Sequence, residues 1–219
     1  MRQLSVLLAS VGLLALLASP ALAGGFAPVP AIKGQKTTLK IRQVGFSGGA
    51  SGHILVDVKN DGQQPQTFEA RGLYFVPKGN AESAPQRVGA VGPFSVKEDQ
   101  KWVTKQRMEI QPGQTVRLKL ETFCLDSHRG APGQGQGYGV AKQRLPEQLM
   151  KDNESAAADA VKASRGNFNA AKGAIQGKVW ENRNKKWIKL EGERANEKGG
   201  SSNSPRRPHR LPIQNQSAD

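Results

Sequence analysis

Cysteine and acidic residues are scarce in this sequence of 219 residues. Cys124 is the only cysteine, so no disulfide can form within the chain and stability must come from a hydrophobic core. Lys and Arg number 32 against 18 Asp and Glu, which gives a net charge of +14. Such an excess favours negatively charged partners, such as nucleic acid, anionic lipid or acidic polysaccharide. The alternative is a basic protein that has no specific anion site.

Long apolar runs are also missing, except at the start of the chain. Arg2 is followed by an apolar stretch over residues 4–17, and residues 21–23 have the small-residue pattern that signal peptidase cleaves. This predicts a cleavable signal peptide over residues 1–23. The stretch is short for a membrane span, which needs about 20 residues, so no integral span is expected after cleavage. We therefore expect export to the periplasm, the cell surface or the extracellular space.

The sequence also contains no recognisable catalytic motif. No G-x-S-x-G or H-E-x-x-H string occurs, and the glycine-rich segment 130–139 lacks the Gly-Lys-Ser/Thr ending of a phosphate-binding loop. Cys124 and His128 are the remaining candidates for a thiolate nucleophile or two metal ligands. On a strand they would lie about 13 Å apart, and the alternative is a buried cysteine beside a surface histidine. We expect no enzyme, no metal and no cofactor.

Alternating apolar and polar residues dominate the middle of the chain. The clearest case is residues 115–125, where Val116, Leu118 and Leu120 alternate with charged residues. Turns rich in Gly, Pro and Asn separate such segments at roughly ten-residue spacing, and no apolar helical period occurs before residue 145. The other segments predicted as strands begin at residue 37 and include 53–59, 67–70, 73–76, 88–96 (broken at 92–93) and 101–110.

This pattern predicts a mainly β protein with an immunoglobulin-like antiparallel β-sandwich over residues 37–141. An extended arm over residues 24–36 precedes it. The helical extension spans residues 142–190, and the basic tail over residues 191–219 is expected to be disordered. Pro146 suits a first helical turn.

Two helices are expected in this extension. Arg165 and Gly166 mark the end of the first, and Asn167 is placed to cap the second. Apolar residues recur at helical spacing in the second helix. They are Phe168, Ala171, Ile175 and Val179.

Two strings resemble immunoglobulin-like modules of uncharacterised bacterial exported proteins. HILVDVKNDGQQPQTFEARGLYFVP resembles the early strands, and RMEIQPGQTVRLKLETFCLDSHRGAP resembles the later ones. A later helical segment of such proteins carries a Q-x-x-W pattern, which Gln176 and Trp180 match with one extra residue. The resemblance covers residues 54–138 and implies a fold and an envelope location, but no activity.

The basic C-terminal part combines aromatic and cationic residues. Trp180 and Trp187 lie among cations, an arrangement that suits contact with a polyanion or a membrane surface. The alternative is a helix that lays its apolar side on the sheet and turns its lysines to water. The candidate polyanion contacts are Lys178, Arg183, Lys185, Lys186, Lys189, Arg206, Arg207 and Arg210.

These observations give three functional hypotheses. The first is a non-enzymatic binding or structural module of the bacterial envelope, cell surface or extracellular matrix, which binds another envelope or surface protein or assembles with itself. The second is a polyanion-binding protein that acts through its basic surface and tail. The third is a small envelope enzyme that uses Cys124 and His128.

Overall fold

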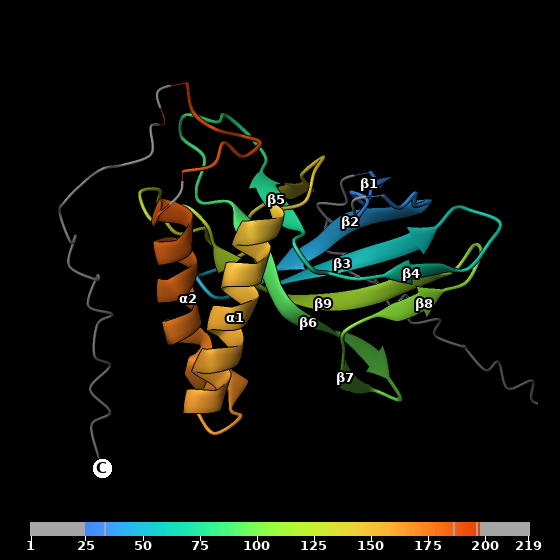
Figure 1. Ribbon diagram of the computed structural model, residues 1–219. Coiled ribbons are helices and arrows are strands. Elements are labelled where there is room, and N and C mark those ends of the chain that lie inside the picture. The colour runs from blue at the N-terminus through green and yellow to red at the C-terminus, as the bar shows by residue number, and fades with distance from the viewer. Residues whose placement is uncertain (1–24, 33, 186, 196, 198–219) are drawn as a thin grey trace, which may run out of the picture.

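The computed structural model describes residues 25–32, 34–185, 187–195 and 197 (Figure 1). Every strand pair is antiparallel. The strands are β1 (Ala27–Pro28), β2 (Leu39–Phe46), β3 (His53–Asn60), β4 (Gln66–Phe68), β5 (Tyr74–Pro77), β6 (Val88–Glu98), β7 (Lys101–Lys105), β8 (Met108–Ile110), β9 (Thr115–Cys124) and β10 (Tyr138–Val140). The helices are α1 (Glu147–Ala163) and α2 (Phe168–Lys185).

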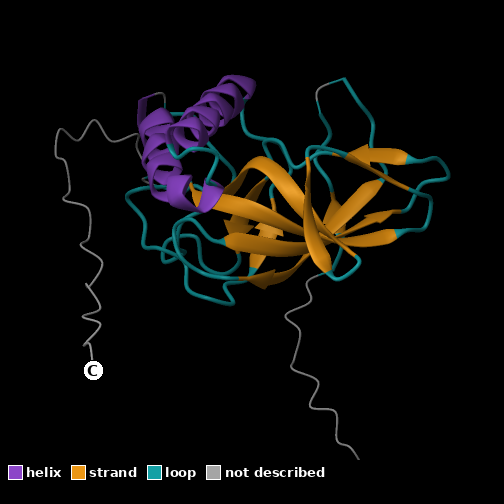
Figure 2. Cartoon of the chain, turned by 90° about the horizontal axis from the view of Figure 1, so that it is seen from below, coloured by secondary structure: helices purple, strands orange, loops and turns teal. Residues whose placement is uncertain are grey.

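One sheet contains most of the strands and curls until it is nearly closed (Figure 2). Its order is β1-β2-β3-β9-β6-β5-β10, with β7 paired to β6, while β4 and β8 form a separate two-stranded sheet. The Gln43 side chain of β2 accepts a hydrogen bond from the Tyr138 N–H of β10 at 2.5 Å and donates one to Gln136 O at 2.7 Å. The mainly β expectation is therefore confirmed, while the immunoglobulin-like sandwich is not confirmed.

A break in the register of β6 accompanies the curl. The pairing of β6 with β9 shifts between Ala90 and Phe94. Gly92 has a φ of 87°, a backbone conformation that glycine adopts without a steric penalty, and Pro93 follows it. Such an irregularity bends a strand and increases its twist. The expected pair of strands over 88–96 is thus one continuous bent strand.

The interior of the curled sheet holds the first part of the core. Alternate residues of β3 and β9 face inward, and the register places Ile54 beside Leu120 and Val56 beside Leu118. All four side chains are buried. A one-residue slip would turn this apolar set outward, so the buried face fixes the register.

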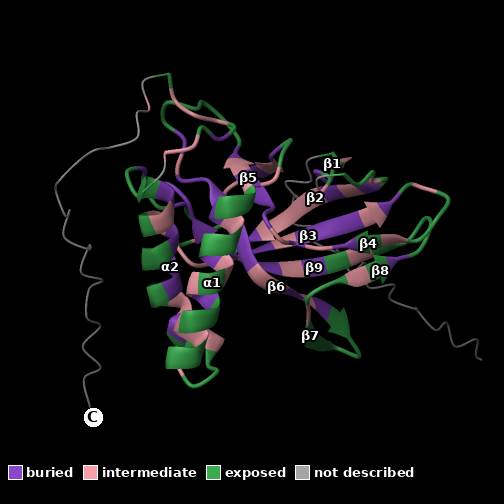
Figure 3. Cartoon of the chain, viewed as in Figure 1, coloured by how far each residue is buried: buried purple, intermediate pink, exposed green. Residues whose placement is uncertain are grey.

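The two helices cover part of the outer face of the sheet (Figure 3). Ala171, Ile175 and Val179 of α2 are fully buried in a second apolar cluster that includes Phe123 of β9. The Oδ1 atom of Asn167 accepts a hydrogen bond from the Ala170 N–H at 3.1 Å. The sequence thus predicted both helices and the buried face of α2 correctly.

Three further differences concern the boundaries. The segment 101–110 forms two strands, and the arm contributes β1, which pairs with β2. Residues 191–195 and 197 make defined contacts, although the sequence assigned them to the tail. The predicted signal peptide and residues 198–219 lie outside the described residues. No helix in the described part of the chain is long and apolar enough to cross a membrane.

Candidate functional site

A groove of about 1000 Å³ lies between the helices and the outer face of β6, β7 and β9. The two helices form one wall, and the β6–β7 hairpin with β9 forms the other, as their positions in Figure 1 indicate. Small and apolar residues of α1, including Ala157, Ala158 and Val161, line the helical wall. This volume lies at the upper end of the range of about 300–1000 Å³ that is common for ligand sites.

The β6–β7 hairpin positions the aromatic residue of this groove. Asp99 and Gln100 both have positive φ, 44° and 67°, as a two-residue primed turn requires. The register then pairs Lys97 with Trp102 and Ser95 with Thr104. Trp102 and Thr104 consequently share the outer face of the sheet, and both line the groove.

Trp102 is one of two large apolar side chains that are exposed in the described residues, the other being Val103. It is 41% exposed, and the Lys119 ammonium lies 5.3 Å from the ring centroid. Phe168, the first residue of α2, lies across the groove and makes an edge contact with Phe123 at 6.3 Å. The groove therefore offers aromatic surface on both walls.

The charges of the groove are partly paired with one another. Glu154 accepts a hydrogen bond from Arg71 at 2.7 Å, and Glu121 pairs with Lys172 at 2.8 Å. Arg107 and Lys162 also line the groove, but neither makes an ion pair within the described residues. These two cations are therefore available to a ligand.

No motif of the sequence indicates this groove. Its lining comes from three strands, two helices and the loops that carry Arg71 and Arg107, so no contiguous motif encodes it. The available signal was the string KWVTK, in which a tryptophan occupies a polar, lysine-flanked strand. Buried strands rarely carry such flanks, since lysine is almost never fully buried.

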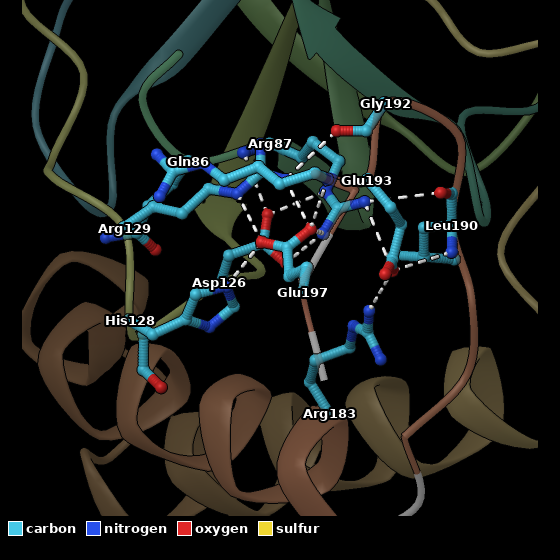
Figure 4. A network of polar contacts seen from close by, with 12 residues as sticks. Gln86, Arg87, Asp126, His128, Arg129, Arg183, Leu190, Gly192, Glu193 and Glu197 are labelled. Atoms are coloured by element: carbon cyan, nitrogen blue, oxygen red, sulfur yellow. Dashed lines mark hydrogen bonds and ion pairs between the residues drawn. The ribbon is translucent and has the colours of Figure 1, made fainter. Parts of the chain in front are cut away.

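A second polar feature is a buried cluster of charges near the C-terminal segment (Figure 4). Arg87 is fully buried and donates to both oxygens of Asp126, from Nε at 2.7 Å and from Nη2 at 2.6 Å. Its Nη1 donates to the main-chain oxygens of Leu190 and Glu191 at 3.3 and 3.2 Å. Burial lowers the pKa of Arg87, but Asp126 outweighs it and the pKa is raised.

Two glutamates extend this cluster from the C-terminal segment. Glu193 accepts from Arg183 at 3.0 Å, and Glu197 accepts from Arg129 at 2.6 Å and 2.5 Å. Burial raises the pKa of Glu197, but hydrogen bonds from Arg129 and His128 outweigh it and lower the pKa to about 2. The carboxylates are enclosed by arginines of the chain itself, so the cluster fastens the segment. Among the described residues, Arg129 Nη1 and the Nε and Nη1 atoms of Arg183 are buried and have no hydrogen-bond partner.

The proposed reactive pair has two separate environments. Cys124 is fully buried, and burial raises the pKa of its thiol to about 12. The Gln176 side chain accepts from the Cys124 N–H at 2.9 Å and donates to the Cys124 O at 2.8 Å. The Nε2 atom of His128 instead lies 2.5 Å from Glu197 Oε1, and its ring centroid lies 5.6 Å from a ring centroid of Trp187. Among the described residues, no group of His, Cys, Asp and Glu could hold a metal ion.

The predicted polyanion contacts are spread over several environments. Lys178 and Lys185 both pair with Glu181, at 2.8 and 2.7 Å. Arg183 is fully buried, and its Cζ atom lies 4.0 Å from a ring centroid of Trp187. It therefore lies inside the fold, away from the surface that a polyanion would reach.

The two other described candidates, Trp180 and Lys189, differ in their burial. Trp180 donates to Gln86 Oε1 at 3.1 Å and packs against the core, while Lys189 is exposed. The candidates that lie outside the described residues are Lys186, Arg206, Arg207 and Arg210.

Comparison with known proteins adds no functional assignment to this geometry. A scan against protein-family models found no matching family, and searches of curated proteins and of solved structures found no similar protein.

Proposed function

We propose that the chain is an exported, non-enzymatic binding module of the bacterial envelope, cell surface or extracellular matrix, and that its ligand occupies the groove beside Trp102. The observation that carries this proposal is the 41% exposure of Trp102 in the wall of a groove of about 1000 Å³. An exposed aromatic side chain in a concave site with convergent polar groups is typical of ligand binding. The signal-peptide pattern of residues 1–23 supports export.

The environment of Cys124 favours a binding role over a thiol enzyme. The nucleophile in thiol chemistry is the thiolate, and a pKa of about 12 leaves it scarce at neutral pH. His128, the other member of the proposed pair, is engaged by Glu197.

The second candidate function is polyanion binding, which the net charge of +14 supports. On α2, however, Lys178 and Lys185 share Glu181 and lower the pKa of this carboxyl to about 2. These ion pairs neutralise part of the positive charge on the surface of α2 that a polyanion would contact. The geometry therefore favours the groove as the main site.

Binding measurements with defined probes test the proposal. Heparin fragments, phosphatidylglycerol vesicles and a phage-displayed library of random dodecapeptides are each offered to the exported chain. We expect at least one probe to bind, and Trp102→Ala to weaken that binding about tenfold because it removes the exposed ring. Val103→Thr is the matched control, because its side chain lies on the opposite face of the same strand and differs little in size.

Two outcomes contradict the groove as the binding site. The first is that no probe binds, and the second is that every bound probe ignores Trp102→Ala. If heparin binding collapses with salt and is indifferent to Trp102→Ala, the polyanion function replaces the first proposal.

A further inference from the structure

The strand β7 has one edge that no described strand covers. It pairs with β6 alone. The two-residue turn makes Glu98 and Lys101 a hydrogen-bonded pair, and such pairs alternate with non-hydrogen-bonded ones along an antiparallel ladder. The main-chain N–H and C=O groups of Trp102 and Thr104 therefore point away from β6. They form a short row of backbone groups that is open to another strand.

The same two residues line the groove with their side chains. A strand that paired with the free edge of β7 would continue the outer face of the sheet, and every second side chain would lie on the groove side. Main-chain hydrogen bonds would then supply affinity, while the groove would supply selectivity. This combination is the basis of strand addition by extended peptides.

Charge indicates which peptide fits this edge. The cations near the groove and hairpin that make no ion pair within the described residues are Lys97, Lys101, Arg107 and Lys162. Glu69 and Asp99 are the carboxylates of this region that likewise make no ion pair. The unpaired charge is therefore positive in balance, and it complements an acidic segment.

A second copy of this chain is a poor occupant of the same edge. Antiparallel pairing of two β7 strands about Val103 would place Lys101 of one copy opposite Lys105 of the other. Like charges directly opposite each other destabilise a strand pair, and each chain carries a net charge of +14. The occupant is thus expected to be a different chain with acidic side chains.

We propose that the groove binds an extended acidic peptide segment of a partner protein, which adds as a strand to the free edge of β7. This inference rests on the proposed function, because it names the ligand of the same groove. Asp or Glu side chains of the peptide pair with Arg107 and Lys162. An alternate residue of the peptide lies against Trp102.

The test uses peptides selected from the dodecapeptide library and synthesised for binding measurements. Thr104→Pro removes one main-chain N–H from the open edge, a position at which an edge strand tolerates proline. Thr104→Ala is the matched control, because it alters the groove side chain and keeps the N–H. We expect selected peptides to be rich in Asp and Glu, and the Thr104→Pro variant to bind them about tenfold more weakly than the Thr104→Ala variant does.

Amide hydrogen exchange of the unmodified chain gives a second readout if Thr104→Pro fails to fold. Peptide binding should slow exchange at the Trp102 and Thr104 amides. Strand addition is wrong if these amides gain no protection, or if a folded Thr104→Pro variant binds as tightly as Thr104→Ala. The acidic character of the ligand is wrong if selected peptides show no excess of Asp and Glu.

The probe panel separates failure of this inference from failure of the proposed function. If no peptide is selected but heparin or vesicles bind in a manner that depends on Trp102, the groove remains a binding site and the acidic peptide is wrong as its ligand. If no probe depends on Trp102, both proposals fail.

Discussion

Arg87 shows how a single side chain can hold together distant parts of this chain. Its guanidinium reaches Asp126, which follows β9, and the main-chain oxygens of residues 190 and 191. Burying a charge is costly unless partners surround it, and here both oxygens of Asp126 accept from the arginine. Removing Arg87 therefore leaves Asp126 buried without the side chain that binds both of its oxygens.

We expect Arg87→Met to lower the free energy of unfolding by about 3–5 kcal/mol, the usual cost of breaking a buried ion pair. The physical reason is that Asp126 stays fully buried after its main counter-charge is lost. Urea denaturation, followed by circular dichroism, measures the change.

The double variant Arg87→Met with Asp126→Leu serves as the control for this prediction. It removes both charges, so its stability should return most of the way to that of the original chain. A loss below about 1 kcal/mol in the single variant would show that Asp126 finds another partner or solvent.

The Gln176 amide illustrates a different use of a polar side chain. It pairs with both main-chain groups of Cys124 and so continues the ladder where β9 ends. Buried main-chain groups need such partners. The sequence pattern drew attention to Gln176 and Trp180, but it did not indicate that the first would serve the backbone of Cys124.

At the scale of elements, the segment that follows α2 behaves as a strap made of residues 187–195 and 197. Its Leu190 side chain is buried in the second apolar cluster, and its Glu193 and Glu197 side chains are held by arginines. Gly192 approaches β5 closely, because a Cβ atom there would lie 2.4 Å from Val76 Cγ1. The strap is therefore held by ion pairs and close packing together with the burial of Leu190.

We expect acid to detach this strap before the rest of the protein unfolds. The pKa of Glu197 is about 2 in the folded chain, below the value of about 4.3 for an unfolded glutamate. Its contribution to stability is thus complete above about pH 4.3 and is lost as pH falls towards 2. The change in Trp187 fluorescence across this range is the measurement.

Glu197→Gln is the control for the acid prediction. This variant cannot lose a charge at residue 197, so the fluorescence change should already be present at neutral pH or be absent throughout. An unchanged acid transition in Glu197→Gln would assign the transition to another carboxyl group.

Elements with a strong local period were predictable from the sequence, whereas elements that depend on distant partners were not. The alternation in β9 and the apolar stripe of α2 each repeat within a short stretch of sequence. The closure of the sheet through Gln43 and Tyr138 joins residues far apart in the chain, and no local pattern encodes it. Residues 191–195 and 197 of the strap were assigned to the tail because their composition is polar, and composition does not reveal that buried arginines bind their carboxylates.

At the scale of the whole molecule, the helices and the curled sheet share an apolar cluster. Ile175 and Val179 of α2 meet Phe123 of β9 in that cluster, and Leu149 of α1 joins them. Because the helices bury their apolar faces against the sheet as well as against each other, the packing of each layer depends on the other.

We expect Ile175→Ala to destabilise the helices and the sheet together, by about 2–5 kcal/mol. Ile175 is fully buried, so the substitution leaves a cavity between the two layers. Helical circular dichroism and hydrogen exchange of the β9 amides should report the same loss.

An exposed position on α1 provides the comparison for that variant. Asp159→Ala changes a solvent-exposed side chain on a helix and should alter stability by less than about 0.5 kcal/mol. If Ile175→Ala melted the helices while exchange in β9 stayed unchanged, the two layers would be independent folding units.

The placement of Glu193 and Glu197 has a consequence for the order of events in synthesis. These residues are among the last that the structure describes, yet they pair with Arg87 and Arg129, which come from much earlier positions. A chain that has been synthesised only as far as α2 lacks these counter-charges, and two of the arginines that they bind are already buried in the finished fold. The arginine cluster is therefore expected to acquire its final partners late in synthesis, once residue 197 is available.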